Sequence, residues 1–196
     1  CLAGAANLKG QIAENDSLLL VYKTTDQDSV KINTLNSLAN FYYDTYPDSG
    51  LYYAREAYTI AVKNNYRPKQ AMLLQTIGVA FDYKGNLDSC LYFLGKSLEI
   101  YKNLELPEKQ SHVITDMALA WYLRGNYELA IRNHLAALEL RKQTGGKKFI
   151  SQSLNNLGLA YKARKDYPAA INYYKKSLVL KEETGDNQGI LNTTMN

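Results

Sequence analysis

The sequence repeats itself every 40 residues, and a fixed repeat of this length restricts the folds that the chain can adopt. Three segments align without gaps, and each begins with a large apolar residue that is followed four positions later by a small one. The pairs are Leu74 and Gly78, Ile114 and Ala118, and Leu154 and Gly158. An earlier copy around Leu35 and Asp48 matches at offsets of 39 and 40, so four copies are present. About three copies are needed for a self-supporting stack, and four exceed that minimum.

Within each copy the apolar residues recur at intervals of three and four, which predicts helices and not strands. Each copy holds two helices, and a short turn containing Gly85 or Gly125 separates them. Glycine suits that place because a helix often ends on a residue with positive φ. The second helix is expected to open at signals such as Asp88 and Ser89. The small residues are expected where two helices approach closely, since larger side chains would overpack the contact.

One copy carries the spacing of a known repeat family. The residues are Leu154, Leu157, Gly158, Tyr161, Ala170 and Tyr174. This spacing resembles the tetratricopeptide repeat, and the resemblance covers roughly residues 30 to 184. It implies an all-α fold, a right-handed superhelical α-solenoid of antiparallel helix-turn-helix hairpins. The period of 40 residues exceeds the family's usual 34, so the helices or linkers are expected to be about six residues longer.

The repeat divides the chain into segments. We predict an N-terminal segment over 1–28 that ends in a capping helix, and the start of a truncated fifth repeat over 187–196. The four full repeats are expected at 29–66, 67–106, 107–146 and 147–186.

Few residues are candidates for chemistry. His134 takes the aromatic position of a second helix, which indicates packing, and His112 has no partner at a suitable spacing. Cys90 takes the place of Ala130 and is expected to be a buried small hydrophobe. No metal-binding spacing occurs, so we predict a protein that is not an enzyme and holds no metal or cofactor.

The net charge of +4 reflects 23 basic against 19 acidic side chains, and this mild excess does not indicate nucleic acid as a partner. No apolar run reaches the roughly 18 residues that span a bilayer.

Three interpretations of the start remain open. Cys1 begins a small, apolar stretch that is typical of a signal-peptide remnant, of a lipidated lipoprotein cysteine, or of an ordinary internal segment. We expect an extracytoplasmic location, periplasmic or lipid-anchored, with the cytoplasm as the alternative. The sequence breaks off where another helix is expected, which indicates a piece of a longer protein.

In the family that this chain resembles, the first helix of each hairpin lines the concave surface. By register, the candidate binding residues of the first two copies are Asn33, Asn36, Asn40, Tyr43, Gln75, Val79, Asp82 and Tyr83. Those of the next two copies are Thr115, Asp116, Leu119, Tyr122, Asn155, Asn156, Leu159 and Lys162.

These side chains indicate the class of partner. Asn36, Gln75, Thr115 and Asn155 form a polar ladder that suits the backbone of an extended or helical peptide. Tyrosines of the kind enriched at binding hot spots flank it. Lys162 is the only basic residue in the set, so we expect a neutral to acidic groove that binds neither a carboxylate tail nor nucleic acid. The alternative is a solvated surface that no partner uses.

The tyrosine-rich hairpins also resemble sensory regions that precede histidine kinase or DNA-binding output domains in Bacteroidetes-type bacteria. This resemblance implies a non-catalytic scaffold that binds a protein or peptide within a larger bacterial signalling protein. The alternative is a structural self-assembly element or free-standing adaptor that forms homo-oligomers through its terminal repeats.

Overall fold

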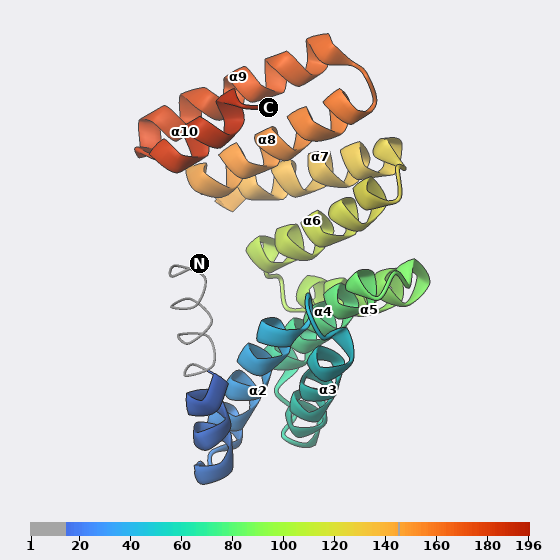
Figure 1. The fold of residues 1–196 in the computed structure, drawn as a ribbon, viewed down its shortest axis with the longest axis vertical. Coiled ribbons are helices and arrows are strands. Elements are labelled where there is room, and N and C mark those ends of the chain that lie inside the picture. Colours follow the sequence, from blue (N-terminus) through green and yellow to red (C-terminus); the bar gives the residue numbers. More distant parts are fainter. Residues whose placement is uncertain (1–14, 145) are drawn as a thin grey trace, which may run out of the picture. The chain divides into compact units, whose positions relative to one another are not determined.

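The structure, a computed structural model, describes residues 15–144 and 146–196, and every regular element in these ranges is an α-helix (Figure 1). The chain forms two compact units, of which the first ends at Ile100 and the second begins at Tyr101. The expectations for Cys1 and its neighbours fall outside the described residues.

Helices pair into hairpins in both units. In the first unit, a helix at 15–24 precedes α2 (Asp28–Tyr42), α3 (Pro47–Lys63), α4 (Arg67–Tyr83) and α5 (Leu87–Asn103), whose last turn belongs to the second unit. The second unit continues with α6 (Pro107–Leu123), α7 (Tyr127–Thr144), α8 (Lys147–Ala163), α9 (Tyr167–Thr184) and α10 (Asn187–Thr194). We call α2, α4, α6 and α8 the A helices, and α3, α5, α7 and α9 the B helices. The predicted all-α fold class, built of antiparallel helix-turn-helix hairpins, is confirmed within each unit.

The turns inside three hairpins end the A helix on a residue in the left-handed conformation. Gly85 has φ +76° and Gly125 has φ +75°, as the sequence predicts, and Lys165 takes the same place with φ +66°. The Gly85 N–H donates to the carbonyl oxygen of Asp82 at 2.8 Å, which closes the last turn of α4. Without glycine, the conformation of Lys165 costs about 1 kcal/mol.

The B helices begin slightly earlier than the sequence indicates. Asn86 accepts a hydrogen bond from the N–H of Ser89 at 3.0 Å, so Asn86 caps α5 and Ser89 lies in its first turn. Asn126 and Asp166, each 40 residues further on, cap α7 and α9 in the same way. A cap residue lies just before the first helical residue, where its side-chain oxygen can accept a hydrogen bond from the N–H three positions further along the chain.

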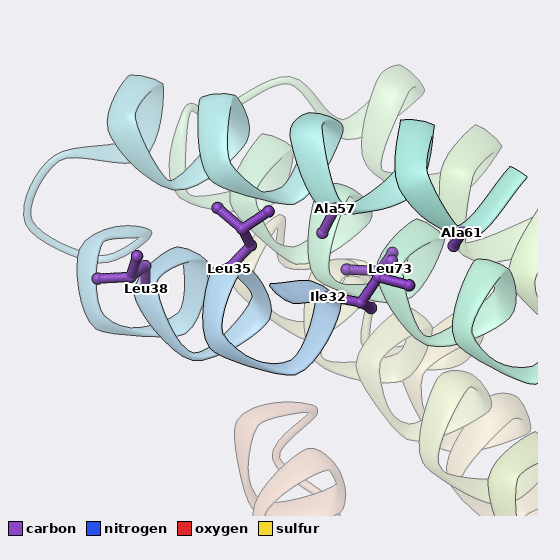
Figure 2. Packing of buried hydrophobic residues seen from close by; sticks show 6 residues of the cluster. All are labelled: Ile32, Leu35, Leu38, Ala57, Ala61 and Leu73. Atoms are coloured by element: carbon purple, nitrogen blue, oxygen red, sulfur yellow. The ribbon is translucent and has the colours of Figure 1, made fainter. Parts of the chain in front are cut away.

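The core of the first unit joins α2, α3 and α4 (Figure 2). Its fully buried members are Ile32, Leu35, Leu38, Ala57, Ala61 and Leu73. Burial of each leucine or isoleucine contributes roughly 1.5–3 kcal/mol. The alanines of α3 face large aliphatic side chains of α2, so the two helices approach closely. The second unit buries a cluster of the same kind: Ile131, Leu138, Leu154, Leu157 and Ala160.

Small residues mark the closest approach within hairpins, as predicted. A Cβ atom added to Gly78 would lie 2.9 Å from Cγ of Leu94. A Cβ atom at Gly158 would lie 2.5 Å from the ring of Tyr174, so this ring packs directly on the backbone of α8.

Candidate functional site

The first unit places its predicted binding residues on two A helices. Asn33, Asn36, Asn40 and Tyr43 lie on α2, and Gln75, Val79, Asp82 and Tyr83 lie on α4. All are exposed or half-buried. The rings of Tyr43 and Tyr83 meet with their centroids 4.9 Å apart, which connects the ends of the two helices.

Two of these amides also bond to the neighbouring A helix. Lys69 Nζ donates to Asn33 Oδ1 at 2.7 Å, and Thr76 Oγ1 donates to Asn36 Oδ1 at 2.9 Å. The carbonyl oxygens of both amides are therefore used inside the unit.

The second unit places the other eight predicted residues on α6 and α8. Thr115, Asp116, Leu119 and Tyr122 lie on α6, and Asn155, Asn156, Leu159 and Lys162 lie on α8. Asn155 Oδ1 accepts from Thr193 Oγ1 of α10 at 3.0 Å. The ring of Tyr122 lies against Tyr127 at 5.6 Å between centroids.

The predicted polar ladder is thus divided between the units, with Asn36 and Gln75 in the first and Thr115 and Asn155 in the second. The oxygens of Asn36, Thr115 and Asn155 already accept hydrogen bonds from neighbouring elements. Because their oxygens already accept, Asn36 and Asn155 offer a ligand mainly their NH2 donors, a bias that the sequence pattern did not reveal.

A buried cation lies behind the A helices of the second unit. Arg141 of α7 is 4% exposed and connects α6 to α8. Its guanidinium donates to the hydroxyls of Ser111 (3.3 Å), Thr115 (3.0 Å) and Ser153 (2.6 Å), and to the carbonyl oxygen of Phe149 (3.1 Å). Burial lowers the pKa of Arg141, but an arginine remains charged throughout the accessible pH range.

The same arrangement recurs one repeat later. Lys181 of α9 is also buried, and its ammonium donates to the carbonyl oxygen of Gly189 at 3.0 Å and to Thr193 Oγ1 at 2.6 Å. Gly189 and Thr193 stand 40 residues after Phe149 and Ser153. Two buried cations therefore lie behind helices of the second unit: Arg141 bonds to α6 and α8, and Lys181 bonds to α10.

Earlier repeats form this connection without a charge. There Gln70 Nε2 donates to the carbonyl oxygen of Ala61 at 3.1 Å, and Gln110 Nε2 donates to that of Tyr101 at 3.2 Å. Ala61 and Tyr101 occupy the position of Arg141. From the sequence, only the 40-residue repeat indicates that Arg141 and Lys181 occupy equivalent positions in successive repeats.

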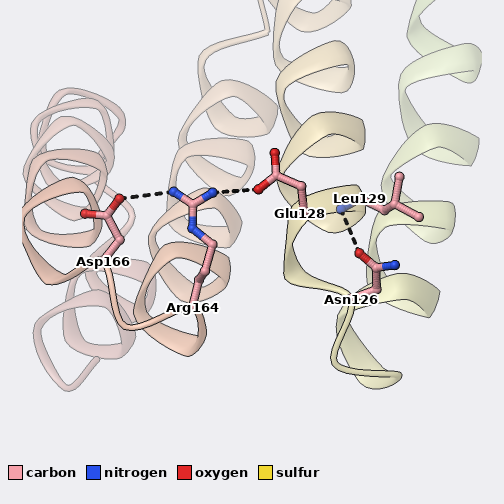
Figure 3. A network of polar contacts seen from close by, with 5 residues as sticks. All are labelled: Asn126, Glu128, Leu129, Arg164 and Asp166. Carbon is pink, nitrogen blue, oxygen red and sulfur yellow. Dashed lines mark hydrogen bonds and ion pairs between the residues drawn. The ribbon is translucent and has the colours of Figure 1, made fainter.

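Surplus basic residues beside the turns form ion pairs between hairpins. Figure 3 shows Arg164 between Glu128 of the preceding hairpin (2.7 Å) and Asp166, the cap of α9 (3.1 Å). Lys84 pairs with Asp48 in the equivalent place of the first unit. These exposed ion pairs connect successive hairpins, but each contributes only about 0–1 kcal/mol to the stability of the fold.

The two histidines lie near Arg141 and not at a reactive site. His134 is 1% exposed, and burial together with the charge of Arg141 lowers its pKa to about 4. No described residue bonds to its Nδ1 atom. Burial and Arg141 also lower the pKa of His112, whose ring packs on Phe149. Packing, which the sequence predicts for His134, is confirmed by this burial.

Open clefts occur on the B-helix side of each unit. One of about 490 Å³ lies among α7, α8 and α9, with Leu135, Leu154, Tyr173 and Leu180 in its walls. Its counterpart of about 400 Å³ lies among α3, α4 and α5. The walls of the larger cleft are mostly aliphatic and aromatic, whereas Arg67, Lys96 and Glu99 also line the smaller one.

Over the described ranges, no group of three His, Cys, Asp or Glu side chains is placed to hold a metal ion. Nor does any helix in those ranges have the length and hydrophobicity that a membrane span requires.

Comparison with known proteins identifies the repeat. Residues 112–183 match the tetratricopeptide repeat family model, and a comparison with curated proteins gives no match. Among solved structures, a Rap protein complexed with Competence and Sporulation Factor has a TM-score of 0.84 at 17% identity, over 95% of this chain and 54% of that one. BtubC from P. vanneervenii has a TM-score of 0.75 at 17% identity, over 92% and 78%.

A third similar structure is the signal transduction ATPase with a tetratricopeptide repeat sensor from Pyrococcus horikoshii. Its TM-score is 0.74 at 21% identity, over 97% of this chain and 30% of that protein. Likeness at such low identity shows the fold alone. Residues 112–183 thus match the tetratricopeptide repeat family by sequence, and the chain shares the fold of the three solved structures.

Proposed function

We propose that the chain is a non-catalytic scaffold that binds a protein or peptide partner on its A helices. The observation that supports this most strongly is the stripe of Asn33, Asn36, Asn40 and Tyr43 on α2. Spacings of three, four and three residues place all four on one side of the helix. Amides can bond to a peptide backbone, and tyrosine rings anchor many interfaces.

The second unit supports the same proposal. Tyr122 and Asn156 are half-buried on α6 and α8, and Leu119 and Lys162 are exposed. This mixture of an apolar, an aromatic, an amide and a cationic side chain is suited to a polypeptide more than to a small uniform ligand.

The proposal includes a context. We infer that the chain is the sensory or interaction region of a larger bacterial signalling protein, located outside the cytoplasm, with the cytoplasm as the alternative. The Rap protein structure with its bound factor and the tetratricopeptide repeat sensor of the archaeal ATPase support a sensory role. Fractionation of the source cells, with detection of the chain, distinguishes the two locations.

Substitution of tyrosines tests the binding surface. Peptides selected from a displayed random library on the purified chain are expected to bind roughly tenfold more weakly to Tyr83→Ala or Tyr122→Ala variants, which lose an anchoring ring. The Tyr92→Ala variant is the matched control, because Tyr92 is 60% exposed on α5 and Tyr83 is 54% exposed on α4. Equal affinity of all three variants and the unaltered chain would rule out the A-helix surface.

A second candidate function is self-assembly through α10. Leu191 and Met195 are large apolar residues that are 53% and 78% exposed at this end of the second unit. If copies associate there, sedimentation velocity is expected to show a weight-average mass that rises with concentration. A double Leu191→Ser, Met195→Ser variant should then remain monomeric. A constant monomer mass for the unaltered chain excludes this function.

A further inference from the structure

The cleft among α7, α8 and α9 of the second unit surrounds its contents with apolar side chains. Its volume is about 490 Å³, and its walls include Leu135, Leu138, Ile150, Leu154, Tyr173 and Leu180. We call it the α7–α9 cleft. Each of these six residues is buried or half-buried, so the apolar surface is recessed between the helices. A ligand therefore reaches this surface only with a narrow group that enters the cleft.

The size of the α7–α9 cleft fits a small molecule. Clefts that bind small molecules measure roughly 300–1,000 Å³. An apolar cavity of about 150 Å³ holds one six-carbon ring, so a cleft of about 490 Å³ has room for a chain of roughly ten carbons. Among the six wall residues, only Tyr173 carries a polar group. The body of a matching ligand is therefore apolar.

Charged side chains lie at the edge of the cleft. They are Glu139, Lys142 and Lys176, and all three are exposed. Lys142 pairs with Glu139 at 2.7 Å, so these two charges offset each other. Among the described residues, no carboxylate pairs with Lys176, whose ammonium lies 5.5 Å from the centroid of the Tyr173 ring. One unpaired cation beside apolar walls complements a ligand with a single negative charge, and Glu139 opposes a second one.

The equivalent place two repeats earlier shows why Lys176 is unpaired. There Lys96 pairs with Glu99 at 3.8 Å. Val179 stands 80 residues after Glu99, as Lys176 does after Lys96. Val179 lines the α7–α9 cleft, so the carboxylate of the earlier repeat is replaced by apolar surface. This one difference leaves the cation unpaired and extends the apolar wall, and both effects favour the same kind of ligand.

We propose that the α7–α9 cleft binds a free amphiphile with one negative charge, of the class of the medium-chain fatty acids. Its alkyl chain lies among the leucines of the cleft, and its carboxylate pairs with the Lys176 ammonium. A lipid within a bilayer is not the source, because the apolar walls are recessed. The cleft is on the B-helix side, so this inference goes beyond the proposed function and does not depend on it.

Calorimetric titration of the full chain with hexanoate, octanoate and decanoate tests the proposal, each below its critical micelle concentration. A buried methylene strengthens binding about fourfold, so each step of two methylenes is expected to strengthen it roughly tenfold. Decyltrimethylammonium is the control, because it has the ten-carbon chain of decanoate and the opposite charge. It is expected to bind at least about tenfold more weakly than decanoate.

Two matched pairs of variants on α9 locate the site. Lys176→Gln is expected to weaken decanoate binding about tenfold, because the carboxylate loses its cation. Lys175→Gln removes the same charge from an exposed neighbour outside the cleft and should leave the affinity within about twofold. Val179→Glu restores the carboxylate of the earlier repeat and is also expected to weaken binding at least about tenfold. Its control is Ile171→Glu, since both residues are 53% exposed and only Val179 lines the cleft.

The proposal is wrong if decanoate does not bind at millimolar concentration, if affinity does not rise with chain length, or if decyltrimethylammonium binds as tightly as decanoate. Equal effects of the two substitutions within either pair would also overturn the assignment to this cleft. None of these results bears on the A helices. If library-selected peptides still lose affinity on Tyr83→Ala, the proposed function stands and only the amphiphile site is wrong.

Discussion

Replacement of Arg141 by alanine is expected to lower the free energy of unfolding of the second unit by about 3 kcal/mol. The substitution removes the guanidinium that bonds to both α6 and α8 and leaves a cavity between them. It also leaves the hydroxyl of Ser153 and the carbonyl oxygen of Phe149 without the donor that satisfies them. Buried polar groups that lose their partner carry most of such a cost.

Urea titration monitored by tryptophan fluorescence measures this effect. The chain has one tryptophan, Trp121 on α6, so its emission reports on the second unit. Arg141→Lys is the matched control, because Lys181 makes two of the equivalent bonds in the next repeat. We expect this variant to lose only about 1 kcal/mol. A change below about 0.5 kcal/mol for Arg141→Ala would show that the cation does not hold the helices together.

Acidification is expected to destabilise the second unit through His134. Its ordinary pKa of 6.5 falls to about 4 in the folded chain, because the ring is buried and lies near the Arg141 charge. The unfolded chain therefore takes up a proton at a pH where the folded chain does not. Stability is complete above pH 6.5 and declines as the pH falls toward 4, by about 2 kcal/mol between pH 8 and pH 5.

The same fluorescence titration, repeated at several pH values, checks this dependence. His134→Leu places the residue of the second copy, Leu94, at this position and is expected to remove most of the slope between pH 8 and pH 5. His112 accounts for the remaining slope, since its pKa is lowered as well. If the His134→Leu variant retains the full slope, protonation of His134 is not its cause.

Much of the fold could be predicted from the repeat itself. The periodic apolar residues specify helices, and Gly85 and Gly125 specify the left-handed turns, because these features are local. Helix starts were less certain, since Asn86 and Asp88 are both good caps and only backbone geometry selects Asn86. Register also gave the A-helix location of the candidate residues, as Asn36 and Tyr83 illustrate.

Interactions between repeats were not predictable in the same way. That Arg141 reaches from a B helix to two A helices depends on side-chain packing, not on helical periodicity. The orientation of the Asn33 amide depends on Lys69, which lies 36 residues away in sequence. The sequence therefore identified polar residues on a surface but not which of their atoms remain free for a ligand.

Binding on the A helices is tested most directly by mapping a library-selected peptide on the isotope-labelled chain by NMR. If the peptide binds the first unit, we predict that the largest chemical-shift changes fall on the side-chain amides of Asn33, Asn36 and Asn40 and on the backbone of α4. If it binds the second unit, we predict that they fall on the equivalent residues of α6 and α8. Largest changes on the B helices, around Tyr52 and Tyr92 or the clefts beside α5 and α9, would contradict binding by the A helices.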